Sequence, residues 1–183
     1  MKRSVGDLTA IALFTALISV LAQFSIPQPF SPVPFTGQIF GVLLAGAILG
    51  SSSGLICILA YLLLGAAGIP VFAMAKGGLH ILFGPTGGYL LGFVPGVYLL
   101  GRIGGDRKEN NGLLLGVGML IFVAITYLCG GLQLALVMKM NFRQTIIAGV
   151  IPYLPLEMVK IAVAIPLASR LRRIICPADK MKE

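Results

Sequence analysis

The feature that most constrains this chain is a succession of long apolar runs, separated by short segments that carry its charges, prolines and glycines. Hydrophobic residues make up 57% of the 183 residues and charged residues only 11%, whereas ordinary soluble domains contain roughly 25% charged residues. A helix needs about 20 mostly apolar residues to cross roughly 30 Å of hydrocarbon. We therefore expect an all-α protein of the lipid bilayer, with residues 1–183 in a single integral membrane domain.

The boundaries of the apolar runs predict a bundle of six transmembrane helices, at about 8–26, 37–50, 53–69, 86–102, 113–138 and 147–173. The run at 37–50 is short and could be tilted, re-entrant or merged with its neighbour across Ser51–Ser53, so that five or seven spans remain open. The first run is longer than the 7–15 residues of a signal-peptide core and is followed by further spans. We expect it to be retained as a helix.

The positions of Lys and Arg predict the orientation of the bundle, because cytoplasmic loops collect these residues. With six spans and both termini inside, the outer segments hold Lys76, Lys139 and Arg143, and the inner segments hold Lys2, Arg3, Arg102, Arg107, Lys108, Arg170, Arg172, Arg173, Lys180 and Lys182. This asymmetry favours cytoplasmic N and C termini. It also explains the net charge of +8 without nucleic-acid binding, which requires a continuous basic and aromatic face.

Glu157 and Lys160 are the ionisable residues that the sequence places inside a span. A charge at the centre of a membrane helix costs about 2.5–3.5 kcal/mol, so that such residues usually face a partner, a cavity or a substrate. Their spacing puts both on one face of a helix. Pro155 suits the first helical position, which would place Glu157 in the first turn near the outer surface. The pair is either a structural ion pair or the docking site of a small polar ligand.

Two loop segments on the predicted outer side are candidates for closing a pocket over that pair. The segment 76–89 holds Gly77, Gly78, Gly84, Gly87 and Gly88, whose backbone N–H groups could cradle an anion. The alternative is close helix packing, which the recurrence of glycine every four residues from 84 to 96 also favours. The segment 27–38 contains four prolines and is either a lid or a rigid connector.

Several motifs that would indicate an enzyme or a motor are absent from the sequence. It contains no nucleotide-binding Gly-Lys-Ser/Thr loop, no Gly-x-Ser-x-Gly elbow and no His-Glu-x-x-His pair. Its three cysteines and its single histidine have no spacing typical of a metal site or a disulfide framework. We therefore expect no catalysis, no metal and no cofactor, and no ATP hydrolysis by this chain alone.

Four motifs of the sequence resemble the BioY family: Val33-Pro-Phe-Thr-Gly-Gln38, Leu64-Gly-Ala-Ala-Gly-Ile-Pro-Val-Phe72, Gly84-Pro-Thr-Gly-Gly-Tyr-Leu-Leu-Gly-Phe93 and Leu154-Pro-Leu-Glu-Met-Val-Lys160. Members of this family are the biotin-specific substrate-capture subunits, or S components, of prokaryotic energy-coupling-factor (ECF) transporters. The resemblance implies a multi-pass, substrate-binding domain of the prokaryotic cell membrane that binds biotin from outside. It also implies association with a transmembrane coupling subunit and two ATPase subunits.

The resemblance assigns roles to particular residues. Ala12 and Ala16, four apart in the first span, resemble the small-residue face through which S components contact the coupling subunit. The ureido ring of biotin has two N–H donors and one carbonyl acceptor, for which Glu157 would be the acceptor and Lys160 the donor. The remaining expected contacts come from the two loop segments and from Phe35, Thr36, Gln38, Phe72, Lys76, Thr86 and Tyr89. Glu157 stands where the family usually has Asp.

Three other functions remain compatible with an apolar chain of this size. A stand-alone small-molecule carrier would need no ATPase partners. An intramembrane enzyme acting on lipids would need a nucleophile or metal cluster of the kinds that the sequence lacks. A purely structural membrane subunit would bind no small ligand.

Overall fold

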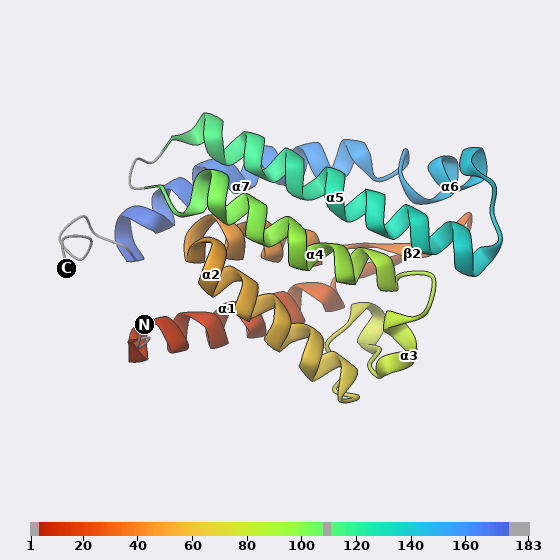
Figure 1. Ribbon diagram of the computed structural model, residues 1–183, viewed down its shortest axis with the longest axis horizontal. Coiled ribbons are helices and arrows are strands. Elements are labelled where there is room, and N and C mark those ends of the chain that lie inside the picture. Colours follow the sequence, from red (N-terminus) through yellow and green to blue (C-terminus); the bar gives the residue numbers. More distant parts are fainter. Residues whose placement is uncertain (1–3, 108–110, 176–183) are drawn as a thin grey trace.

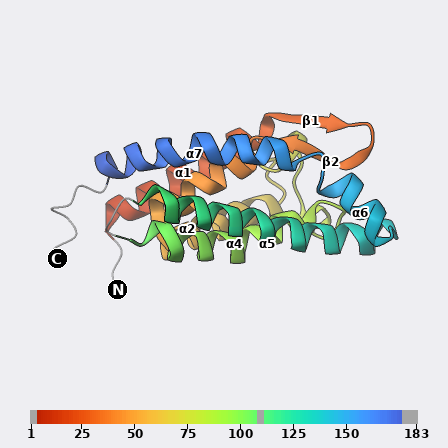
Figure 2. The ribbon, with the colours of Figure 1, turned by 90° about the horizontal axis from the view of Figure 1, so that it is seen from above.

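The computed structural model describes residues 4–107 and 111–175 of the chain, with side chains as far as 172. Its elements, in chain order, are α1 (Val5–Gln23), β1 (Ser25–Gln28), β2 (Ser31–Thr36), α2 (Gln38–Ala66), η1 (Ala73–Ala75), α3 (Leu79–Leu82), α4 (Gly87–Leu100), η2 (Gly101–Gly105), α5 (Gly112–Met138), α6 (Phe142–Gly149) and α7 (Leu154–Ile175). The long helices form one elongated bundle, in which α1 begins and α7 ends at the same end (Figures 1 and 2).

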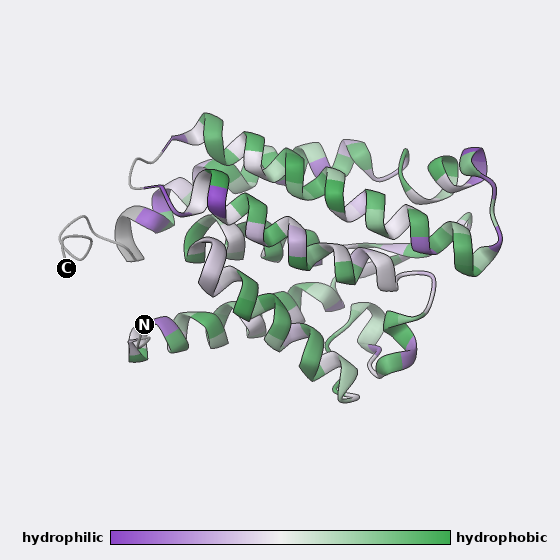
Figure 3. Ribbon diagram, viewed as in Figure 1, coloured by the Kyte–Doolittle hydropathy of each residue, from purple (hydrophilic) through white to green (hydrophobic). Residues whose placement is uncertain are grey.

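The predicted class, a helical membrane protein, is confirmed in its main feature. Among the described residues, α1, α2 and α5 are long and apolar enough to cross a membrane, and α6 with α7 forms a bent pair that makes a fourth candidate. Hydrophobic residues cover the helices, and hydrophilic ones lie mainly toward the two ends of the bundle (Figure 3). Helix α5 differs by a single residue from the predicted span 113–138.

The two predicted spans 37–50 and 53–69 are the two halves of α2, which reverses direction at Gly50. Gly50 has φ +76° and ψ −172°, outside the helical region. A Cβ placed on Gly54 would lie 3.4 Å from the Cα of Gly46, whereas eight residues of straight helix rise about 12 Å. The chain therefore doubles back here.

Asp106, which follows η2, stabilises this reversal of α2. Its carboxylate accepts hydrogen bonds from the backbone N–H and the hydroxyl of Ser51, at 2.8 and 2.6 Å. These bonds cap the N-terminus of the second half of α2, where backbone donors would otherwise lack partners. A Cβ on Gly50 would overlap Asp106 Oδ1, so that the site requires glycine for space as well as for φ.

One predicted helix lies three residues earlier than expected, another is interrupted, and the fold is not purely helical. Helix α1 ends at Gln23 and is followed by the antiparallel hairpin of β1 and β2, with Ser25 opposite Thr36 and Gln28 opposite Ser31. Prolines are tolerated there because each strand of a two-stranded sheet has one open edge. The predicted helix 147–173 is interrupted between α6 and α7, which are bent by 47°. Pro152 lies in that break and cannot donate a helical hydrogen bond.

Glycines on α4 pack against α5. A Cβ on Gly92 would lie 3.0 Å from the Cα of Thr126, and a Cβ on Gly88 or Gly96 would overlap Cys129 or Phe122. This packing is the role predicted for Gly92 and Gly96.

The basic residues divide between the two ends of the bundle. Arg102 and Arg107, after α4, lie at the end where α7 finishes, and Lys76, Lys139 and Arg143 belong to loops or helix starts at the opposite end. The predicted inner residues Lys2, Arg3, Lys108, Lys180 and Lys182 lie outside the described residues, as does the side chain of Arg173.

Candidate functional site

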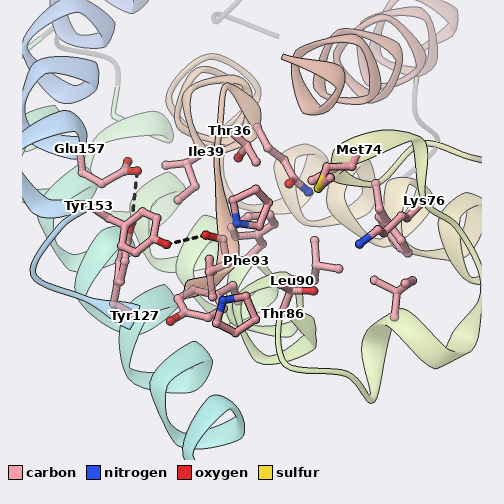
Figure 4. A pocket seen from close by; sticks show the side chains of 18 residues that line it. Thr36, Ile39, Met74, Lys76, Thr86, Leu90, Phe93, Tyr127, Tyr153 and Glu157 are labelled. Carbon is pink, nitrogen blue, oxygen red and sulfur yellow. Dashed lines mark hydrogen bonds between the residues drawn. The ribbon is translucent and has the colours of Figure 1, made fainter. Parts of the chain in front are cut away.

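A cavity opens at the end of the bundle that carries the β-hairpin, α3 and α6 (Figure 4). With the open space at its mouth included, the atom-free volume is about 710 Å³. Six of the residues that the sequence predicts for a ligand site line it: Thr36, Gln38, Lys76, Thr86, Tyr89 and Glu157. Phe72, expected as a wall, lines it too.

Glu157 lies in the first turn of α7, as predicted from Pro155. Its side chain is only 2% exposed. One carboxylate oxygen, Oε1, accepts from Lys160 Nζ at 2.8 Å and from the Tyr127 hydroxyl at 3.2 Å. The other oxygen, Oε2, is buried and has no hydrogen-bond partner among the described residues. Leaving a buried charged acceptor unpaired is costly, so that Oε2 is a ready acceptor for a ligand in the cavity.

Lys160 lies behind the carboxylate and is not among the residues that line the cavity. Besides Glu157, its ammonium donates to the backbone carbonyl of Thr36 at 2.8 Å. These bonds use two of its three donors. Lys160 therefore joins β2 to α7 and fixes the position of the Glu157 carboxylate.

Lys76 lies on the opposite side of the cavity from Glu157 (Figure 4). It follows η1, where Met74 and Ala75 adopt left-handed backbone conformations. Their N–H groups donate to Ser25 Oγ and Gln23 Oε1, both at 3.0 Å. The turn that carries Lys76 is thereby tied to the end of α1 and to β1.

The predicted glycines lie outside the cavity lining and contact the chain's own backbone. Gly77 packs on the Ile69 carbonyl, and Gly88 packs on the Cys129 carbonyl. The remaining three follow the same pattern: a Cβ on Gly87 would overlap the Leu82 carbonyl, Gly78 N–H donates to Gly65 O at 2.7 Å, and a Cβ on Gly84 would lie 3.3 Å from the His80 carbonyl. Their predicted part in cradling an anion stays a prediction.

Two predicted side chains contribute to the surroundings of the cavity in other ways. Phe35 does not line it, but its ring packs against Tyr153 with centroids 4.7 Å apart. Gln38, 4% exposed, donates to the Tyr61 hydroxyl at 2.6 Å, which in turn donates to the Val71 carbonyl at 2.9 Å. This chain of bonds holds the N-terminus of α2 against the loop that follows it.

Sequence reasoning missed an aromatic wall formed by Tyr127 and Tyr153. The Tyr127 ring lies 5.6 Å from Tyr89 and 6.3 Å from Tyr153. The Tyr153 hydroxyl donates to the Val33 carbonyl, and the Tyr89 hydroxyl to Gly149 O. A tyrosine in an apolar span needs a partner for its hydroxyl, and this signal could have singled out Tyr127. Of the other lining residues, Pro32, Val33, Pro34 and Ile81 belong to the two loop segments expected to close the pocket, and the residues that were missed are Ile39, Ala73, Met74, Leu90 and Phe93.

The cavity has polar groups at two ends and a largely apolar middle. Glu157 offers an unpaired acceptor at one end, and Lys76 offers a cation at the other. Such a site suits a small molecule that has N–H donors at one end, an apolar body and an anionic group at the other. Among the described residues, no three His, Cys, Asp or Glu side chains are grouped so as to hold a metal ion.

Comparison with known proteins gives the family. Residues 1–176 match the BioY family. The chain belongs to the BioY family. The biotin transporter BioY of Thermotoga maritima is 40% identical over 168 residues, which cover 92% of this chain and 96% of that protein. The probable biotin transporter BioY of Pyrococcus horikoshii is 40% identical over 166 residues, 91% and 96% of the two chains.

The fold has a close counterpart among solved structures. The crystal structure of the S-component for biotin from an ECF-type ABC transporter superposes with a TM-score of 0.86, at 28% identity and over 92% of both chains. The names of these BioY relatives are those of transporters.

Proposed function

We propose that this chain is the biotin-binding S component of an ECF-type vitamin uptake transporter, a multi-pass protein of the prokaryotic cell membrane. It binds biotin from outside and works with a coupling subunit and two ATPase subunits. Its membership of the BioY family and its likeness to a biotin S-component support this function. Within the site, the observation that best supports biotin binding is the buried, unpaired Oε2 of Glu157 beside the cavity.

In the proposed pose the ureido ring of biotin lies against Glu157, and Oε2 accepts a hydrogen bond from one N–H group of that ring. Charge-assisted bonds of this kind are roughly twice as strong as neutral ones. Lys160, which was expected to donate to the ureido carbonyl, acts instead by holding the carboxylate from behind. The apolar thioether ring and stem of biotin lie along Leu90 and Phe93, and its carboxylate reaches Lys76.

The two ends of the proposed pose are separable by calorimetry on the purified protein. Lys76→Gln should weaken binding of biotin but leave binding of biotin amide, which lacks the carboxylate, nearly unchanged. Glu157→Gln should weaken both ligands. Lys139→Gln, which removes a cation at the same end but outside the cavity, is the matched control and should change neither. Equal losses of both ligands in Lys76→Gln would exclude the assigned orientation.

We further propose that the chain crosses the membrane six times with both termini in the cytoplasm. In this count each half of α2 crosses once and α6 with α7 forms one bent span. The reversal at Gly50 supports the count. The basic residues at the end where α7 finishes support the orientation.

We propose the α1 face of Ala12 and Ala16 as the contact for the coupling subunit. Both residues are exposed on the outside of the bundle, where small side chains allow a neighbouring helix to approach closely. The double variant Ala12→Trp/Ala16→Trp should lose co-purification with the coupling subunit and keep biotin binding. Val117→Trp, a similar change on exposed α5, is the control. Unchanged co-purification would refute this contact.

A further inference from the structure

A second hollow lies on the outer surface of the bundle, between α5 and the α6–α7 pair. Its lining is almost entirely apolar and includes Ala124, Gly131 and Ala135 on α5 and Phe142 and Ile146 on α6. In Figure 1, α5 and α6 lie at the edge of the bundle opposite α1. The groove is therefore distant from the face proposed for the coupling subunit.

The groove exists because small residues form its floor and large ones its rim. Ala124, Gly131 and Ala135 leave space on α5, while Leu128 and Phe142 are 64% and 81% exposed. From Ala124 to Ala135 the helix rises about 17 Å, close to the roughly 15 Å of one leaflet's hydrocarbon. An apolar groove of this length within one leaflet matches one acyl chain, which fills it and gains van der Waals contact with its floor.

Two cations follow the lining residues in the chain at the outer end of the groove. Arg143 is next to Phe142 in the first turn of α6, and Lys139, four positions after the last α5 residue of the lining, also lines a separate hollow with Met140 and Gln144. Both side chains are exposed. The described acidic residues do not neutralise them: Asp7 and Asp106 belong to the opposite end, and Glu157 is buried against Lys160. A guanidinium and an ammonium at this depth suit a phosphate group.

We propose that this groove binds an anionic phospholipid, with one acyl chain along α5 and the phosphate held by Lys139 and Arg143. The assignment does not depend on biotin, because it uses a different ligand and, apart from Tyr127, different lining residues. Each cation near a membrane surface strengthens the binding of an anionic headgroup by about fivefold. Two such cations give a preference for an anionic over a zwitterionic lipid of at least about tenfold.

The test is native mass spectrometry of the intact, delipidated protein, titrated with phosphatidylglycerol or with phosphatidylcholine of the same acyl chains and without biotin. The wild type should bind phosphatidylglycerol at least about tenfold more tightly. Lys139→Gln/Arg143→Gln should remove this preference. Ala124→Leu/Ala135→Leu, which fills the groove, should weaken both lipids. Arg102→Gln/Arg107→Gln, at the other end of the bundle, should keep the preference.

Three results would overturn the proposal. The first is equal affinity of the wild type for the two lipids. The second is a preference that survives Lys139→Gln/Arg143→Gln or disappears in Arg102→Gln/Arg107→Gln. The third is displacement of the bound lipid by the coupling subunit, which would assign the groove to a protein partner. Thermal unfolding of each variant in detergent shows whether it is folded, and the groove variants replace exposed or half-buried alanines and leave the core unchanged.

Discussion

Replacing Glu157 by glutamine should weaken biotin binding by about 100-fold, and the reason lies in the partners of its two oxygens. Oε1 already accepts from Lys160 and Tyr127, and both of these partners are donors. The side-chain amide of the Glu157→Gln variant must therefore turn its oxygen toward them, which points its NH₂ group at the ligand. A donor then faces the N–H donors of the ureido ring.

The magnitude follows from two losses. A hydrogen bond to a charged group contributes about 1.5–3 kcal/mol, and a buried donor left without an acceptor costs about 1–3 kcal/mol. A combined loss of about 3 kcal/mol corresponds to roughly 100-fold in affinity, at about 1.4 kcal/mol for each factor of ten. Calorimetry of biotin binding to the purified protein measures it. Asp7→Asn, which neutralises an acidic residue outside the cavity, is the control and should bind normally.

A second variant tests the orientation of the amide. In Glu157→Gln/Lys160→Met the strongest donor to Oε1 is gone, so that the amide can rotate and offer its oxygen to the ligand. The double variant should therefore bind biotin roughly tenfold more tightly than Glu157→Gln alone, at about 1.4 kcal/mol for each factor of ten. Two results would refute this account of the carboxylate. One is normal biotin binding by Glu157→Gln, and the other is a double variant whose loss of affinity equals the sum of the losses in Glu157→Gln and Lys160→Met.

The remaining predictions concern the fold and the transport cycle. Gly50→Ala should destabilise the protein by about 1–3 kcal/mol, because Gly50 has a positive φ and a Cβ there would overlap Asp106. Thermal unfolding measures this loss against the control Gly112→Ala, whose Cβ would make an ordinary van der Waals contact. Equal stabilities of the two variants would contradict this prediction. In a cysteine-free background, a membrane-impermeant maleimide applied to intact cells should label Lys139→Cys but not Arg170→Cys, and the reverse pattern would invert the proposed orientation. Vesicles that contain this chain alone should not accumulate biotin against a gradient, whereas accumulation would favour the stand-alone carrier.

The sequence predicted most where a single physical requirement decides the structure. An apolar run long enough to cross a bilayer needs its backbone hydrogen bonds satisfied internally, and α5 begins and ends within a residue of its prediction. Pro155 fixes the start of a helix, and Glu157 lies in the first turn as expected. The ion pair with Lys160 follows from their spacing and is present at 2.8 Å.

The features that were missed depend on partners far apart in the chain. In the sequence, the β1–β2 hairpin looks like a proline-rich connector, because proline argues against a strand. Its prolines are acceptable only because each strand of this hairpin has an open edge. Tyr153 lies 120 residues from Val33, to which its hydroxyl donates. An apolar helix surrounded by lipid also shows weak periodicity, since its outward face is as apolar as its inward one. The sequence therefore marks Tyr127 as a side chain whose hydroxyl needs a partner, but it does not show that this partner is Glu157 beside the cavity.

The central claim, that the unpaired oxygen of Glu157 receives the ureido ring of biotin, is tested most directly by a crystal structure of the protein with biotin bound. We expect a ureido nitrogen within hydrogen-bond distance of Glu157 Oε2, Lys160 still bonded to Oε1, and the biotin carboxylate toward Lys76. Biotin bound in the reverse orientation, or outside this cavity with Oε2 still unpaired, would contradict the claim.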